Sequence, residues 1–156
     1  YNLVPPSDWV LVSLLPRPTG MTLWFLGNRG FLSYNLAIDQ WGVFELGADV
    51  MARVPAVLQR ENLVWFLTGE SLGRFDTNTG AVHLRQLPVI PSSQSVLEAT
   101  IDAVWLLLDG AIFVGAPEGE AWTSVALAAP CLQGAVHLAF WDGALWVGGT
   151  AGVGRS

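Results

Sequence analysis

The feature that most constrains the fold is a tryptophan that recurs at a nearly constant interval along the 156-residue chain. Four apolar segments carry it: TLWFLG from residue 22, LVWFLT from 63, AVWLLL from 103 and ALWVGG from 144. Their tryptophans are separated by 41, 40 and 41 residues: Trp24, Trp65, Trp105 and Trp146. A period of this length across a whole chain indicates a repeat protein, in which one structural unit is used several times.

Each repeat reads as four short β-strands. The tryptophan segments are apolar at consecutive positions, which is typical of a strand that is buried on both faces. A turn and a second element follow each tryptophan after five or six residues, an apolar run precedes it, and a polar turn with another short segment comes later. No segment shows a clear 3.6-residue period. We therefore predict an all-β fold, a β-propeller with four blade repeats of about 40 residues and four-stranded antiparallel blades.

The last repeat is shorter than the others, and this bears on how the ring closes. We expect a single domain over residues 1–156, with repeats at about 8–46, 51–87, 95–126 and 134–156. The last repeat stops after its third strand, so its outer edge lacks a partner. We predict that residues 1–4 complete the last blade by pairing with residues 152–155. Pairing within one chain gives a four-bladed ring, and pairing between chains gives a homo-oligomer or a larger propeller completed by a partner chain.

Two repeats carry a resemblance to known propellers. The segments LVWFLTGESLGRFDTNTGAVHLRQLP and GAVHLAFWDGALWVGGTAGVGRS resemble blades of the two-component-regulator propeller family. They are also similar to streptogramin lyase propellers, which share the Trp-Phe and Asp-x-x-Thr-Gly features. The first resemblance implies a non-enzymatic module for ligand sensing or protein interaction, outside the cytoplasm and thus periplasmic or secreted. The second implies the alternative, a propeller lyase or hydrolase with an axial active site.

The segment Gly69-Glu70-Ser71-Leu72-Gly73 matches the G-x-S-x-G pattern of a nucleophile elbow. That elbow needs a helix after the serine, whereas LGRFDTNTG reads as a strand and a turn. Ser71 also stands in register with a glycine in each of the other three repeats. We therefore expect Ser71 to be structural and predict no catalytic residue.

Metal and cofactor sites are not predicted either. The segment from Asp76 begins like a calcium loop, but Leu87 occupies the position of the bidentate ligand. We expect instead a turn in which Asp76 and Thr79 bond the local backbone. His83 falls on an outer strand and His137 on an innermost strand of the repeat register, so the two histidines should lie far apart.

Charge and hydropathy limit the partners. The chain has seven arginines, no lysine and 13 acidic residues, for a net charge of −6, so it lacks the basic stripe that nucleic acid requires. Residues 121–141 carry no charge and are long enough to span a membrane, but Pro130, Gln133 and Gly134 interrupt them. We expect a protein that is not membrane-spanning.

The ligand or partner is expected at one face of the propeller. In propellers of the types resembled, ligands meet the loops that lead into the inner strand and those that join the second and third strands. These loops hold Asp8, Arg29, Asp49, Glu70, Asp109 and Gln133. Because four of the six are acidic, a cationic or polyhydroxylated small polar ligand, or a protein partner, suits them better than an anion.

Removal of residues 1–6 tests the predicted closure of the last blade. We expect the deletion to expose the edge of that blade, and therefore to lower the melting temperature of a closed ring or to abolish an oligomer. Calorimetry and light scattering measure the two effects. If melting temperature and molecular mass both stay unchanged, the N-terminus does not close the blade.

Overall fold

The computed structural model describes residues 4–15, 21–46, 57–60, 62–90, 95–126, 134–150 and 152–155, with residues 13 and 57–60 described by their backbone. These residues form fifteen β-strands and, within the described ranges, no helix. The predicted all-β class is therefore confirmed.

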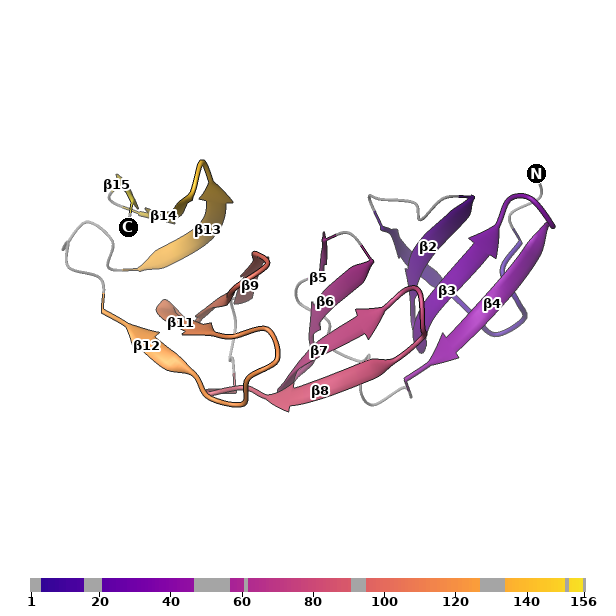
Figure 1. Cartoon of the computed structure of the whole chain (residues 1–156), viewed down its shortest axis with the longest axis horizontal. Coiled ribbons are helices and arrows are strands. Elements are labelled where there is room, and N and C mark those ends of the chain that lie inside the picture. The colour runs from indigo at the N-terminus through magenta and orange to yellow at the C-terminus, as the bar shows by residue number, and fades with distance from the viewer. Residues whose placement is uncertain are drawn as a thin grey trace.

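The strands form four antiparallel sheets, each built from one continuous stretch of chain (Figure 1). The first sheet contains β1 (Leu11–Leu14), β2 (Thr22–Gly27), β3 (Gly30–Asn35) and β4 (Gln40–Glu45). The second contains β5 (Val57–Arg60), β6 (Leu63–Leu67), β7 (Ser71–Asp76) and β8 (Val82–Gln86). The third contains β9 (Ser95–Ala99), β10 (Val104–Leu108), β11 (Ala111–Gly115) and β12 (Thr123–Val125). The fourth contains β13 (Ala135–Trp141), β14 (Ala144–Gly149) and β15 (Gly152–Arg155).

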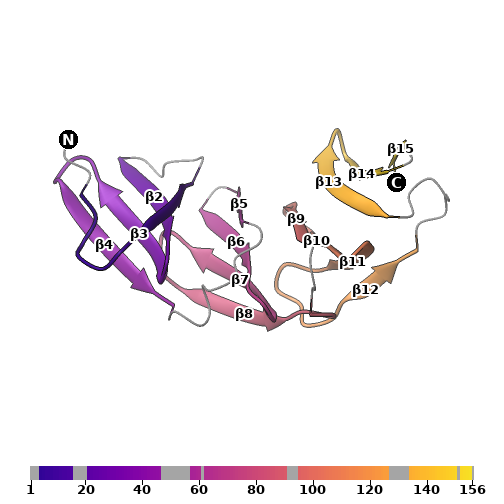
Figure 2. The ribbon, with the colours of Figure 1, turned by 180° about the vertical axis from the view of Figure 1, so that it is seen from behind.

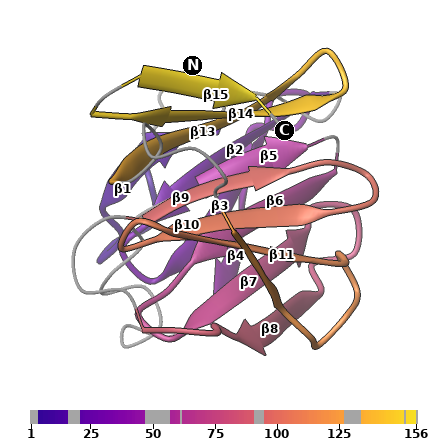
Figure 3. The ribbon, with the colours of Figure 1, turned by 90° about the vertical axis from the view of Figure 1, so that its left-hand side faces the viewer.

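The sheets follow one another along an open arc, with the first and the fourth at its two ends (Figures 1 and 2). Figure 3 views the arc from the end at which the fourth sheet lies. Residues 1–3 lie outside the described residues, so the predicted pairing of residues 1–4 with the last strand stays a prediction. The observed neighbour of β15 is β14.

Each repeated tryptophan lies on the second strand of its sheet, as the sequence predicts: Trp24 on β2, Trp65 on β6, Trp105 on β10 and Trp146 on β14. The first three tryptophans face the next sheet along the chain, and the hydrophobic core lies between consecutive sheets. In β10, Leu106 packs in the cluster of Trp65, whereas Leu107 packs with residues of the fourth sheet. This two-sided burial explains the consecutive apolar residues of the repeats.

Aromatic side chains fill the interface between the first and second sheets. The rings of Phe31 and Phe75 stack with centroids 4.6 Å apart, and Trp24 meets Phe75 edge-on at 5.2 Å. Phe66 contacts Phe31 edge-on at the same distance of 5.2 Å. Offset-stacked and edge-to-face pairs of this kind stabilise a core beyond the area that they bury.

The two glycines of the G-x-S-x-G segment differ in their surroundings. A Cβ atom at Gly73, on β7, would overlap the ring of Phe66. A Cβ atom at Gly69, in the turn between β6 and β7, would meet nothing within 4 Å. Gly73 is therefore required by close packing.

Substitution of the two glycines by alanine tests this difference. Gly73→Ala should lower the free energy of unfolding by about 1 to 3 kcal/mol, because Phe66 must leave its place in the aromatic interface. Gly69→Ala is the matched control and should change stability by less than about 0.5 kcal/mol. Urea denaturation followed by circular dichroism measures both. Equal effects of the two substitutions would contradict the packing argument.

Candidate functional site

The structure places the predicted loop residues in separate turns. Asp8 precedes β1, Arg29 lies between β2 and β3, Glu70 between β6 and β7, and Asp109 between β10 and β11. Asp49 and Gln133 lie outside the described residues. The first two turns are joined, because the Val10 N–H donates to Asn28 Oδ1 at 2.9 Å and the Asn28 N–H donates to the Val10 carbonyl at 3.0 Å. Glu70 and Asp109 belong to the second and third sheets.

Several of these residues also have a local structural role. Arg29 forms an ion pair with Glu45, and its guanidinium lies 6.0 Å from the centre of the Trp9 ring. Asp109 has a φ of 49° and is followed by a glycine with a φ of 84°, a combination that favours a tight hairpin turn. The carbonyl of Glu70 accepts the Leu87 N–H at 2.9 Å. The turns are therefore ordered partly by the residues predicted to bind.

Ser71 is the first residue of strand β7 and closes the hairpin that precedes it. Its N–H donates to Thr68 Oγ1 at 2.9 Å, and its carbonyl accepts the N–H and the hydroxyl of Thr68 at 2.8 and 3.1 Å. A strand and not a helix follows, as the sequence predicts. Ser71 therefore does not stand on a strand-to-helix elbow.

The turn that begins at Asp76 is the predicted backbone-bonded one. Asp76 Oδ1 accepts the N–H groups of Asn78 at 2.8 Å and of Thr79 at 3.3 Å, and Thr79 Oγ1 accepts the Ala81 N–H at 3.2 Å. The hydrogen bond from the Asn78 backbone is the main cause that lowers the pKa of Asp76 below its usual value. The carboxylate is thus occupied by its own turn.

The two histidines lie on different sheets. His83 is on β8, the outer strand of the second sheet, and His137 is on β13, the first strand of the fourth. Their predicted strands are therefore confirmed. Within the described ranges, no group of three His, Cys, Asp or Glu side chains could hold a metal ion.

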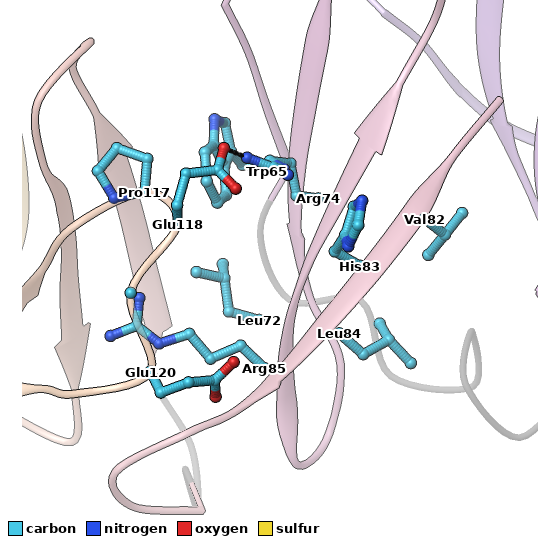
Figure 4. Close-up of a pocket in the computed structure, with 11 residues that line it drawn as sticks. Trp65, Leu72, Arg74, Val82, His83, Leu84, Arg85, Pro117, Glu118 and Glu120 are labelled. Carbon is cyan, nitrogen blue, oxygen red and sulfur yellow. Dashed lines mark ion pairs between the residues drawn. The ribbon is translucent and has the colours of Figure 1, made fainter. Parts of the chain in front are cut away.

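A cavity of about 270 Å³ lies between the second sheet and the turn that connects β11 to β12 (Figure 4). The buried side chains of Trp65 and Leu72 contribute to its apolar part. Trp65 lies opposite Arg74, and Arg74 lies opposite His83, so these residues form one row across β6, β7 and β8. The acidic side chains of the lining come from residues 117–120 of the third sheet.

Arg85 fixes the outer strand of the second sheet to that turn. Its side chain is 8% exposed, and its Nη1 and Nη2 atoms donate to the carbonyls of Ala116, at 2.9 Å, and Ala121. The guanidinium lies 3.6 Å from the centre of the Trp122 ring, whose Nε1 donates to the Gln86 carbonyl at 3.0 Å. Burial lowers the pKa of Arg85, and the charge of Glu120 opposes this shift.

An ion pair between Arg74 and Glu118 crosses the cavity (dashed line in Figure 4). The side chain of Arg74 is 14% exposed and lies 5.9 Å from the centre of the Trp65 ring, whereas that of Glu118 is 74% exposed. The carboxylate is therefore at the rim, with the cation beneath it. Such an arrangement suits recognition of a charged group beside an apolar surface.

None of the described residues predicted to bind from the sequence, other than those of the second blade's turn, adjoins this cavity, and Arg74, Arg85 and Glu118 carry no motif that would have indicated it. One signal in the sequence could have indicated the cavity. Arg74 lies opposite the repeated tryptophan of the second sheet, whereas the equivalent positions of the first and third sheets hold the uncharged residues Ser33 and Val114.

Solved structures show what the sheets form. The chain is similar to the extracellular domain of the hybrid two-component system BT4673 from B. thetaiotaomicron, with a TM-score of 0.69 and 14% identity. It is also similar to virginiamycin B lyase from Staphylococcus aureus, with a TM-score of 0.63 and 20% identity, and to PorZ of the type-IX secretion system of Porphyromonas gingivalis, with 0.61 and 14%. The chain has the β-propeller fold. Its four sheets are blades, and the resemblance to both propeller types is confirmed at the level of the fold.

The matches cover different shares of the two chains. The match to the BT4673 domain covers 94% of this chain and 20% of that domain. The match to the lyase covers 98% of this chain and 57% of the lyase, and the match to PorZ covers 93% of this chain and 22% of PorZ. The chain thus spans about a fifth of the length of the first structures that it matches. No protein-family model and no curated protein matches the sequence. In the part of the chain that the structure describes, no helix has the length and hydropathy needed to cross a bilayer.

The lowered pKa of Asp76 predicts how stability depends on pH. A carboxyl group whose pKa is lower in the folded state stabilises the fold above its unfolded pKa, and this contribution disappears as the pH falls through the folded pKa. Asp76→Ala should therefore cost about 1 kcal/mol near neutral pH and progressively less below about pH 4. Asp76→Asn keeps the Oδ1 acceptor and should lose only the dependence on pH. Urea denaturation between pH 2.5 and 7 measures this, and an identical pH slope in wild type and Asp76→Asn would contradict it.

Proposed function

We propose that this β-propeller is a non-enzymatic binding module that works outside the cytoplasm and recognises a protein partner or a small polar ligand. The extracytoplasmic location rests on two similar structures, which are an extracellular domain and a bacterial surface component. Recognition without catalysis rests on the cavity between the second and third blades.

The charged groups of this cavity are arranged for binding. Arg85 is held by backbone carbonyls and by the Trp122 ring, and Arg74 is held by Glu118. Neither arginine is positioned to exchange a proton, because a guanidinium stays protonated at physiological pH. The exposed carboxylate of Glu118 is the group that can exchange its partner Arg74 for a charged group of a ligand.

The ligand that fits is a cation on a short apolar stem, such as the side chain of an arginine of a partner protein. Its stem would pack on Trp65 and Leu72, and its charge would meet Glu118 and Glu120 at the rim. The net charge of −6 draws such a ligand toward the protein. In this proposal the turn residues form a second surface for the same class of partner: Asp8, Arg29, Asp49, Glu70, Asp109 and Gln133.

Titration with Nα-acetyl-arginine amide tests the proposal, with Nα-acetyl-glutamine amide as the uncharged control ligand. We expect the indole N–H signal of Trp65 in ¹H–¹⁵N NMR spectra to shift with saturation for the arginine compound. The double variant Glu118→Gln and Glu120→Gln should bind about tenfold more weakly, because it loses both rim charges.

A second double variant controls for net charge. Asp102→Asn with Asp142→Asn removes two exposed carboxylates that do not line the cavity, and its affinity should stay within about twofold of wild type. The proposal fails if the arginine compound gives no saturable shift, or if the two double variants lose the same affinity.

A further inference from the structure

The Arg74–Glu118 ion pair restricts the charge that a ligand of the cavity can carry. The side chain of Arg74 is 14% exposed, and that of Glu118 is 74% exposed. If Glu118 turns to the cation of a ligand, Arg74 keeps the ring of Trp65 and loses its carboxylate. Because a largely buried charge without its partner is strongly destabilising, the exchange costs least when the same ligand also supplies an anion to Arg74.

Arg85 adds a second cationic group with an unused donor to the same lining. Leu72 lies opposite Arg85 across β7 and β8, and Arg74 lies two residues from Leu72 on β7, so the two arginines project from one face of the blade. The Nε atom of Arg85 is buried and has no hydrogen-bond partner among the described residues. A buried donor without an acceptor is costly, so this group also favours an anion in the cavity.

The charged side chains of the cavity lining balance one another. Two are cationic, Arg74 and Arg85, and two are anionic, Glu118 and Glu120 (Figure 4). A ligand that brings one cation and one carboxylate preserves this balance, whereas a ligand with a single charge of either sign disturbs it. The lining therefore suits a ligand that carries both charges.

The size of the cavity limits such a ligand to about one residue. Its volume of about 270 Å³ lies just below the range of about 300 to 1,000 Å³ that is typical of pockets for drug-sized molecules. Trp65 and Leu72 provide the surface for a short apolar stem. A cation, such a stem and a carboxylate occur together in an arginine that ends a chain, whereas the α-carboxyl group of an internal arginine is part of a peptide bond.

We propose that the cavity binds the C-terminal arginine of a partner protein, with its guanidinium at Glu118 and Glu120 and its α-carboxylate on Arg74. In the free protein the carboxylate of Glu118 takes the place of this α-carboxylate on Arg74. The inference rests on the proposed function and narrows its ligand from any arginine side chain to one at a chain end.

Four small compounds test the inference through the indole N–H signal of Trp65 in NMR titrations. Nα-acetyl-arginine carries both charges, Nα-acetyl-arginine amide the cation alone, and Nα-acetyl-citrulline the carboxylate alone on nearly the same stem. We expect Nα-acetyl-arginine to bind about tenfold more tightly than the amide. L-arginine should bind more weakly than Nα-acetyl-arginine, because its α-ammonium group would lie beside the guanidinium of Arg74. Equal affinities for these two would assign the cavity to the free amino acid and overturn the assignment to a chain end.

Substitution of each member of the ion pair provides a second readout. Arg74→Gln should abolish the tenfold preference for the carboxylate over the amide. Arg155→Gln is the matched control and should keep it, because Arg155 lies opposite Trp146 as Arg74 lies opposite Trp65 but does not line the cavity. Glu118→Gln should weaken binding of the amide and strengthen binding of Nα-acetyl-citrulline several-fold, because the competing carboxylate is gone.

The outcomes separate this inference from the proposed function. If the amide gives a saturable shift and Nα-acetyl-arginine binds no more tightly, the inference is wrong and the proposed function stands. The inference is also wrong if Glu118→Gln leaves binding of Nα-acetyl-citrulline unchanged or weakens it. If neither arginine compound binds, both proposals are wrong.

Discussion

Burial between consecutive sheets is the interaction on which the rest of the structure depends. A sheet with apolar faces must bury them against another element, and the sheets of this chain do so against one another. Each sheet of this chain therefore packs on its neighbours, and in the first two interfaces the repeated tryptophan is a member of the shared cluster. The period of 40 or 41 residues is the sequence counterpart of this requirement, because every unit must present the same face to the next.

The cavity between the second and third blades follows from the same packing. Trp65 and Leu72 belong to the apolar cluster that joins the two sheets. Nearer the outer strand β8, the cavity is lined by the charged side chains of arginine and glutamate residues. Arg85 is buried there at the cost of desolvation, which two carbonyls and the Trp122 ring compensate. The cavity thus lies at the border of a structural contact.

The features that could be predicted are those that depend on neighbouring residues or on the repeat period. The tryptophan period located the second strands, and the residues after Asp76 indicated a turn with its own hydrogen bonds. The cavity could not be predicted, because it depends on contacts such as Arg85 to Ala116, which lie 31 residues apart on different repeats. A repeat pattern reports that two units meet and does not report which polar side chains face each other at the junction. The binding roles of Asp8, Arg29, Glu70 and Asp109 stay predictions for the same reason.

The composition of the interfaces changes along the arc. The first interface is filled by aromatic rings, including Phe31, Phe66 and Phe75, whereas the third is filled mainly by aliphatic residues such as Ile112 and Leu138. Among the described residues the fourth blade has three strands and each of the other blades has four. Local opening in a linear array is easiest for the unit with the fewest contacts, so we expect amide protons of β13 to β15 to exchange faster than those of the first two blades. On this argument the end of the arc with the aromatic interface resists local opening more than the end with the aliphatic one.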